Sequence, residues 1–155
     1  MSGGRRDRLV VGAVMTSRAA VLLVSTDADS AEMYAVGLSL AGFEPLVAAD
    51  ASRMRSCLGS ESPQAIVMDF TPGWETGWDL LRDLRSSPDT RDTPVVLVAS
   101  RMETSTRQRA EAFGCAAVLI KPCLPDALAA ALRRAIQMPP GVVTTVAEPL
   151  RERHH

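Results

Sequence analysis

The chain has 155 residues and carries 17 lysine plus arginine against 18 aspartate plus glutamate, a formal net charge of -1. A chain so close to neutral has no electrostatic footprint for nucleic acid, so we expect no nucleic-acid partner. Hydrophobic residues make up 46% of the chain, but no apolar run reaches the length that spans a bilayer, and we expect no membrane partner. Without a secretion signal, the expected location is cytoplasmic.

The ends of the chain differ from its centre. Residues 1–18 are expected to be a disordered N-terminal extension, because their only apolar run, 9–15, is short and lacks a cleavage site before the first strand. Residues 19–138 have the size of one α/β domain. Residues 139–155 open with Pro139-Pro140-Gly141 and are expected to be a linker or tail, in which 142–146 is able to pair as an extra strand.

Strand-like and helix-like segments alternate through the central region. Five segments have strand character, four of them short and continuously apolar: 20–24, 44–49, 65–68, 95–98 and 116–120. Continuous apolar runs are typical of parallel strands that are buried on both faces. The order β-α repeated five times therefore predicts a five-stranded parallel sheet with helices on both faces.

The first predicted helix begins at Asp29, which forms a capping box with Glu32, and ends before Gly42. Its apolar face is expected to contain Met33, Val36 and Leu40. Further helices are predicted at 52–58, around Leu80, Leu81 and Leu84, at 104–113, and from Pro125 through Leu128, Leu132 and Ile136.

Two charged residues stand at the ends of predicted strands. Asp69 closes the third strand and Lys121 closes the fifth. The carboxyl ends of parallel strands meet at one edge of a sheet, so both residues are expected at the same edge. Lys121 is the single lysine in a chain whose other cations are all arginine. An ammonium on a flexible stem differs chemically from a planar guanidinium, which makes Lys121 a candidate site residue.

The central region resembles the response-regulator receiver domains of two-component signalling. The residues that carry this resemblance are Asp69, Pro72-Gly73, Gly77, Thr93-Pro94, the segment Ala-Glu-Ala-Phe-Gly-Cys-Ala at 110–116, and Lys121-Pro122. The resemblance implies a flavodoxin-like (βα)5 fold. It also implies that Asp69 is the phosphoacceptor, that Lys121 contacts the phosphoryl group, and that Mg²⁺ is held by Asp69, the backbone of Thr71 and an acidic pair after the first strand.

The acidic pair is absent, since the matching residues are Ser25 and Thr26. Hydroxyl groups are poor replacements for carboxylates toward Mg²⁺, so any Mg²⁺ is expected to bind weakly. Asp27, the next residue, is a weak replacement ligand because reaching the metal requires the loop to be re-aimed. A carboxylate is still able to act as a phosphoryl nucleophile, and Lys121 supplies one of the positive charges that a phosphoryl group needs.

The positions that relay phosphorylation in the family also differ. A Ser or Thr ends the fourth strand in the family and an aromatic residue lies in the fifth, whereas Ala99 and Val118 stand at these positions here. Ser100 comes one residue late, which on a continuing strand directs it to the opposite face.

Three functions are consistent with these residues. In the first, the chain is a stand-alone receiver that a histidine kinase or phosphotransfer protein phosphorylates on Asp69. Its output is then a contact with a downstream protein partner, and it has no enzymatic activity of its own. Alternatively, it is a pseudo-receiver that binds partners without phosphorylation. The third is a small enzyme or cofactor carrier on a flavodoxin-like scaffold, although no phosphate-binding glycine loop supports it. The resemblance also allows a homodimer through the fourth and fifth helices.

Overall fold

The computed structural model describes residues 18–71, 74–137 and 145–147. The predicted alternation of strands and helices is present. Its elements are β1 (Ala19–Ser25), α2 (Ala28–Leu40), β2 (Phe43–Ala48), α3 (Ala51–Ser60), β3 (Ala65–Phe70), α4 (Thr76–Ser86), β4 (Val95–Ala99), α5 (Thr104–Ala112), β5 (Ala117–Ile120), α6 (Pro125–Gln137) and β6 (Thr145–Ala147). Residues 1–17 of the predicted extension at 1–18, the pair Pro72-Gly73 and most of the predicted tail lie outside the described residues.

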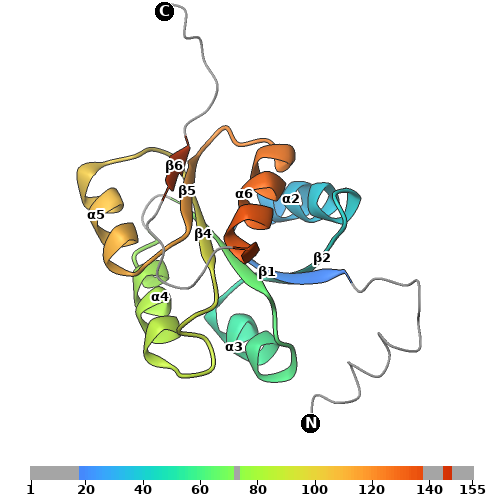
Figure 1. The fold of residues 1–155 in the computed structure, drawn as a ribbon, viewed down its shortest axis with the longest axis horizontal. Coiled ribbons are helices and arrows are strands. Elements are labelled where there is room, and N and C mark those ends of the chain that lie inside the picture. Colours follow the sequence, from blue (N-terminus) through green and yellow to red (C-terminus); the bar gives the residue numbers. More distant parts are fainter. Residues whose placement is uncertain (1–17, 72–73, 138–144, 148–155) are drawn as a thin grey trace, which may run out of the picture.

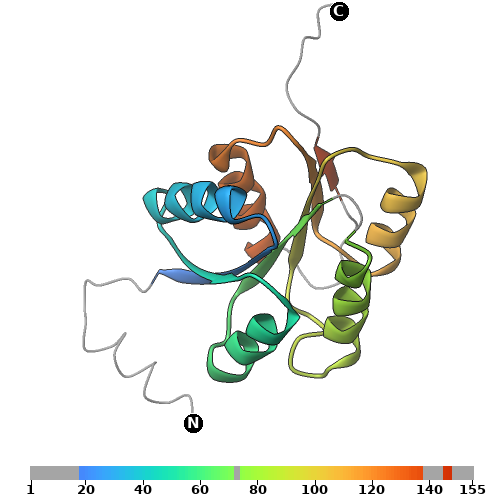
Figure 2. The ribbon, with the colours of Figure 1, turned by 180° about the vertical axis from the view of Figure 1, so that it is seen from behind.

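All strands run parallel in one sheet of order β2-β1-β3-β4-β5-β6 (Figures 1 and 2). The five predicted strands and five helices form the predicted flavodoxin-like receiver fold. The short β6 adds to the edge beyond β5, with Val118 opposite Val146. It overlaps the segment 142–146 that was expected to be able to pair, of which 142–144 lies outside the described residues. No helix in the described ranges is long and apolar enough to cross a membrane.

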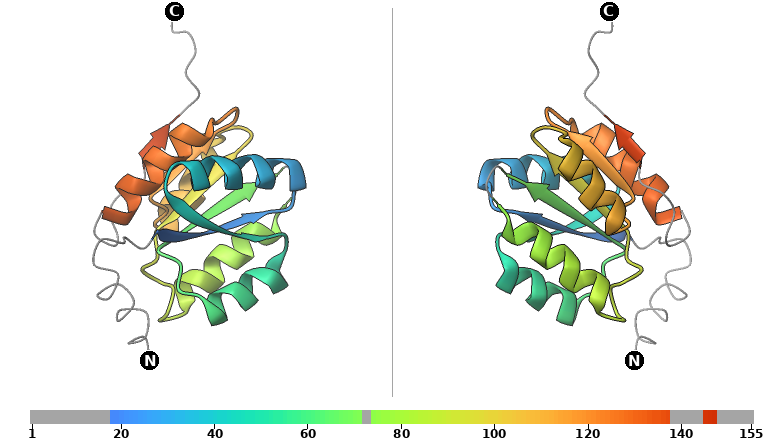
Figure 3. Two further views of the ribbon diagram at one scale, coloured as in Figure 1. Left: turned by 90° about the vertical axis from the view of Figure 1, so that its right-hand side faces the viewer. Right: turned by 90° about the vertical axis from the view of Figure 1, so that its left-hand side faces the viewer.

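Alternate residues along strands β1 to β5 enter two separate hydrophobic cores. In β1, Val21 and Leu23 belong to one core and Leu22 and Val24 to the other. Helices α2 and α6 cover the first face of the sheet, while α3 and α4 cover the second together with α5 (Figure 3). Burial on both faces explains why the strands are continuously apolar, as the sequence predicted.

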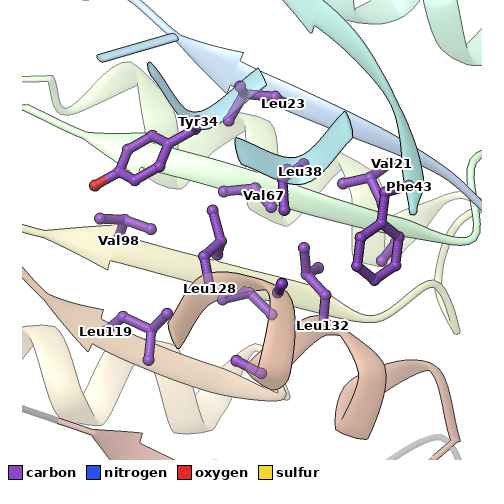
Figure 4. Packing of buried hydrophobic residues seen from close by; sticks show 14 of the residues in the cluster. Val21, Leu23, Tyr34, Leu38, Phe43, Val67, Val98, Leu119, Leu128 and Leu132 are labelled. Carbon is purple, nitrogen blue, oxygen red and sulfur yellow. The ribbon is translucent and has the colours of Figure 1, made fainter. Parts of the chain in front are cut away.

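The first core is built mainly from aliphatic side chains of the central strands and of α2 and α6 (Figure 4). Leu128 and Leu132 point from α6 into this core, as their spacing predicted. The predicted apolar face of α2 is wrong. Met33, Val36 and Leu40 are exposed, and the helix is buried through its other apolar residues, Ala31, Tyr34 and Leu38.

The start of α2 also differs from the prediction. The N-cap is Asp27, not Asp29, and the Asp27 carboxylate accepts a hydrogen bond from the Ser30 hydroxyl at 2.6 Å. Asp29 lies in the first turn, where a negative charge is favoured by the helix dipole. The predicted end of the helix is confirmed, because Gly42 follows it with φ of 101°, a conformation that favours glycine.

One arginine ties the C-terminal part of α4 to the neighbouring loops. The Arg85 guanidinium donates hydrogen bonds to the backbone carbonyls of Phe113 and Thr93, each at 2.7 Å, and to those of Thr90, Arg91 and Gly114 at 3.1 to 3.3 Å. Burial lowers the pKa of Arg85, but the carbonyl oxygens compensate for the lost water. This residue thereby connects α4, the start of β4 and the turn that follows α5.

Candidate functional site

Asp69 lies at the carboxyl end of β3, a strand buried along its whole length. Its side chain has no exposed surface. The strand register places Asp69 opposite Ser25, the last residue of β1. A carboxylate at such a position is costly unless charged or hydrogen-bonding groups surround it, so its contacts define the site.

The first contact is the cation that the sequence singled out. Lys121 follows β5 directly, and its Nζ lies 2.7 Å from Asp69 Oδ1. The contact is an ion pair rather than an aligned hydrogen bond, since Oδ1 has no partner with hydrogen-bonding geometry. The Lys121 side chain retains 24% of its surface exposed, so its ammonium bridges the buried carboxylate and the solvent.

The second contact comes from one of the residues that replace the acidic pair. The Ser25 hydroxyl donates a hydrogen bond to Asp69 Oδ2 at 2.8 Å, and Ser25 is itself buried. A second carboxylate at this position would instead repel Asp69 in the absence of a metal. The structure therefore brings Asp69, Lys121 and Ser25 together, with each carboxylate oxygen facing a different partner.

Two other groups near Asp69 remain protonated at neutral pH. Burial raises the pKa of Cys123 to about 11, and the negative charge of Asp69 adds to this shift. Burial likewise raises the pKa of Tyr34, again with contributions from Cys123 and Asp69. A protonated thiol or phenol is a weak nucleophile. Asp69 is thus the group in this cluster that is suited to attack an electrophile.

The residues present do not fit a tight Mg²⁺ site. Asp27 is exposed, and the hydrogen bond from Ser30, which is the main cause of its lowered pKa, holds its carboxylate at the helix start. The Thr71 carbonyl accepts a hydrogen bond from the Trp74 amide at 3.1 Å. Within the described ranges, no three His, Cys, Asp or Glu side chains are grouped to hold a metal ion.

Of the three positions predicted for the switch, Ala99 and Val118 belong to the second hydrophobic core, and Ser100 directly follows β4. Ala99 ends β4 opposite Phe70, and Val118 is fully buried within β5. The expectation for Ser100 applied only to a strand that continues past Ala99. Because β4 ends at Ala99, the two-residue alternation stops there, and Ser100 lines the same cavity as Ala99.

An aromatic cluster that the sequence analysis did not predict adjoins these positions. The Phe70 ring packs edge-on against Trp74 and Trp78, with centroids 5.3 Å and 4.7 Å apart. Gly77 is required here, because a Cβ atom at this position would lie 2.8 Å from Phe70 Cζ. The eight-residue spacing from Asp69 to Gly77 is the signal in the sequence that marks this contact.

A parallel α/β sheet with a buried Asp-Lys pair at its carboxyl edge defines a receiver-like module, and comparison with known proteins identifies the family. Residues 21–133 match the response regulator receiver domain model. The chain therefore belongs to the response-regulator receiver domains of two-component signalling.

Curated relatives and solved structures agree with this assignment. The chain is 26% identical over 117 residues to the phosphate regulon transcriptional regulatory protein PhoB of Pseudomonas aeruginosa, covering 76% of this chain and 51% of that protein. For PhoB of Escherichia coli the identity is 29% over 113 residues, with 73% and 49% covered. The chain thus spans about half the length of these relatives. The chemotaxis response regulator CheY4 of Vibrio cholerae shares the fold, with a TM-score of 0.69, 24% identity, and 77% of this chain and 99% of that chain covered.

Proposed function

We propose that this chain is an atypical receiver in a phosphorelay, in which Asp69 accepts a phosphoryl group and Lys121 contacts it. The observation that carries the proposal is the 2.7 Å ion pair between Lys121 Nζ and Asp69 Oδ1 at the carboxyl edge of the sheet. The ammonium is already placed where a phosphoryl group on Asp69 would bring negative charge. It is also partly exposed, which suits a group that meets an incoming phosphodonor.

The transfer forms one bond and breaks another. An oxygen of the Asp69 carboxylate attacks phosphorus, and the bond from phosphorus to the histidine nitrogen of the donor breaks. The nitrogen keeps the electron pair and the product on Asp69 is an acyl phosphate. Oδ1 faces only the ammonium, whereas Oδ2 accepts the Ser25 hydrogen bond. Oδ1 is therefore the better nucleophile once Lys121 moves to the phosphoryl group.

The partners of this reaction follow from the family. The phosphodonor is a histidine kinase or a phosphotransfer protein, and the signal leaves through contacts with a downstream protein, with a homodimer through α5 and α6 as one form. We place the reaction in the cytoplasm and assign no enzymatic activity beyond it. The transcriptional role in the names of the curated relatives belongs to proteins of which this chain spans about half.

A second candidate is the pseudo-receiver, which binds partners without phosphorylation. One observation favours it. The Asp69 carboxylate has no exposed surface, and Ser25 and Lys121 each engage one of its oxygens. A fully enclosed carboxylate reaches phosphorus only if Lys121 or the adjoining loops move. On this alternative, Asp69 is a structural ion-pair partner.

Intact mass spectrometry separates the two candidates. The protein is incubated with a small phosphodonor, with and without Mg²⁺, and the expected result is one phosphoryl adduct that forms slowly. Asp69→Asn should remove the adduct, because an amide of the same shape does not attack phosphorus. Circular dichroism confirms that the variant is folded. No adduct on the wild type would support the pseudo-receiver, and an adduct on Asp69→Asn would assign the reaction to another residue.

A further inference from the structure

A cavity beside the Asp69 site lies between the segments that follow β3 and β4, and Thr71 is part of its lining. Its volume is about 350 Å³, within the range of sites that hold small ligands or single side chains. Ala99 forms part of its wall beside the aromatic rings of Phe70, Trp74 and Trp78. The small side chain at Ala99 leaves open the space that a larger residue at the end of β4 would fill.

The cavity offers two groups that a cation is able to pair with. Glu75 and Glu103 contribute carboxylates to its lining, and each of them faces one arginine, Arg109 at the margin and Arg101 within the lining. Three aromatic rings, those of Phe70, Trp74 and Trp78, also line the cavity, and the face of an aromatic ring attracts a cation. The carboxylates are held only by exposed ion pairs, at 3.8 Å for Glu103 with Arg101 and at 3.3 Å for Glu75 with Arg109. Such pairs are weak, so an incoming cation is able to replace them.

An arginine of the chain already contacts an aromatic ring and a carboxylate beside this cavity. The Arg109 guanidinium lies over the Trp78 ring, 5.1 Å from its centroid, and is ion-paired with Glu75. One planar cation is therefore already held between an indole and a carboxylate at the margin of the cavity. Trp74 and Glu103 offer the same two groups inside it. Guanidinium stacks on a ring and bonds a carboxylate at the same time, which an ammonium does less well.

We propose that this cavity binds an arginine side chain of a partner protein. The arginine stacks on Trp74 and pairs with Glu103, and its aliphatic stem covers Phe70 and Ala99. The site gives the chain a protein contact in the region where the switch residues of other receivers stand. It requires no phosphoryl group on Asp69, so its validity does not depend on the phosphorelay function.

Nuclear magnetic resonance of the tryptophan side chains tests the proposal. Three capped tripeptides are titrated into the ¹⁵N-labelled chain, with arginine, citrulline or lysine at the centre. Citrulline has the shape of arginine without its charge, and lysine has the charge without the planar guanidinium group. Trp74→Phe assigns the two indole signals. The arginine peptide should shift the Trp74 signal saturably and bind about tenfold more tightly than the citrulline peptide, with lysine between them.

Two glutamate variants provide matched controls. Glu103→Gln should weaken the arginine peptide about threefold or more, whereas Glu111→Gln, which changes an exposed glutamate of α5 outside the cavity lining, should leave binding unchanged. Asp69→Asn should also leave it unchanged, which keeps this test independent of phosphorylation. Equal binding of the arginine and citrulline peptides, equal effects of the two glutamate variants, or no saturable shift would each overturn the proposal.

Discussion

Two sets of side chains near the carboxyl edge of the sheet, a closed half and an open half, differ in how fully they are engaged. The closed half is Asp69, Lys121 and Ser25, from the ends of β3, β5 and β1, which contact one another at 2.7 and 2.8 Å. The open half is Ala99, which ends β4 and borders a cavity, and Val118 within β5, which has no polar group to offer. The residues proposed to accept a phosphoryl group are therefore separate from the positions that relay phosphorylation in the family, so one set is able to persist while the other changes.

The largest effect on stability should come from removing the cation of the closed half. Lys121→Met removes the cation and leaves the Asp69 carboxylate buried without its ion partner, which should lower the free energy of unfolding by about 3 kcal/mol. Urea denaturation measures this change. The double variant Asp69→Asn with Lys121→Met should recover most of the loss, because no buried charge remains. A single variant as stable as the wild type would mean that Lys121 contributes little to holding Asp69.

The next largest effect on stability should come from Arg85, which anchors the segments around the open half. Arg85→Met leaves several carbonyls without their donor, including those of Thr93 and Phe113, and should lower the free energy of unfolding by about 2 kcal/mol. Amide exchange should rise at the end of α5. Arg82→Met is the control on the same helix, because Arg82 makes only an exposed ion pair with Asp79, and it should cost no more than about 0.5 kcal/mol. Equal losses in the two variants would show that the carbonyl contacts are not stabilising.

Restoring the acidic pair should convert the closed half into a metal site. Ser25→Asp with Thr26→Asp places like charges beside Asp69, so without metal the protein should be less stable by about 1 kcal/mol. Mg²⁺ should reverse this loss and raise the rate of phosphorylation. The control is Ser25→Asn with Thr26→Asn, which has the same shape without the charges and should respond to neither. Thermal melts across a Mg²⁺ titration, together with intact mass, measure both responses. No Mg²⁺ response in the acidic variant would show that the two carboxylates do not create a metal site.

The smallest effect, a change in amide exchange, should follow when a hydroxyl is placed at position 99 of the open half. With a phosphoryl mimic bound, wild-type amide exchange should change in the loop after Asp69 but very little across residues 99–114. Ala99→Thr has room in the adjoining cavity and should extend the change into α5. Ala99→Val has the same shape without the hydroxyl and should behave as the wild type. Broad changes in the wild type would show that the chain switches without the usual residues.

The sequence predicted the sheet and the meeting of Asp69 with Lys121 because both depend on simple geometry. Continuous apolar runs require burial on two faces, and parallel strands bring their carboxyl ends to one edge. The leucines of α4 and α6 were also predicted correctly, since polar residues surround their apolar stripes. In these elements a single pattern specifies a single arrangement.

Other features depend on tertiary contacts that spacing does not encode. Helix α2 carries apolar residues on more than one face, so periodicity alone does not decide whether Leu38 or Leu40 is buried. The Ser25 hydrogen bond requires the register between β1 and β3. The cavity requires the relative placement of the loops after β3 and β4. For the functional roles of Asp69 and Lys121, the sequence and the structure supply a proposal that the experiments above test.

The contact between Gly77 and Phe70 has a consequence for how the sequence is able to change over time. The ring of Phe70 fills the space in which a side chain at position 77 would begin. A substitution at either position therefore alters what the other accepts. Alanine at position 77 would force the Phe70 ring to shift or favour a smaller residue at position 70. The two positions should therefore covary among relatives, and the size of the residue next to Asp69 should depend on a helix that follows it in the chain.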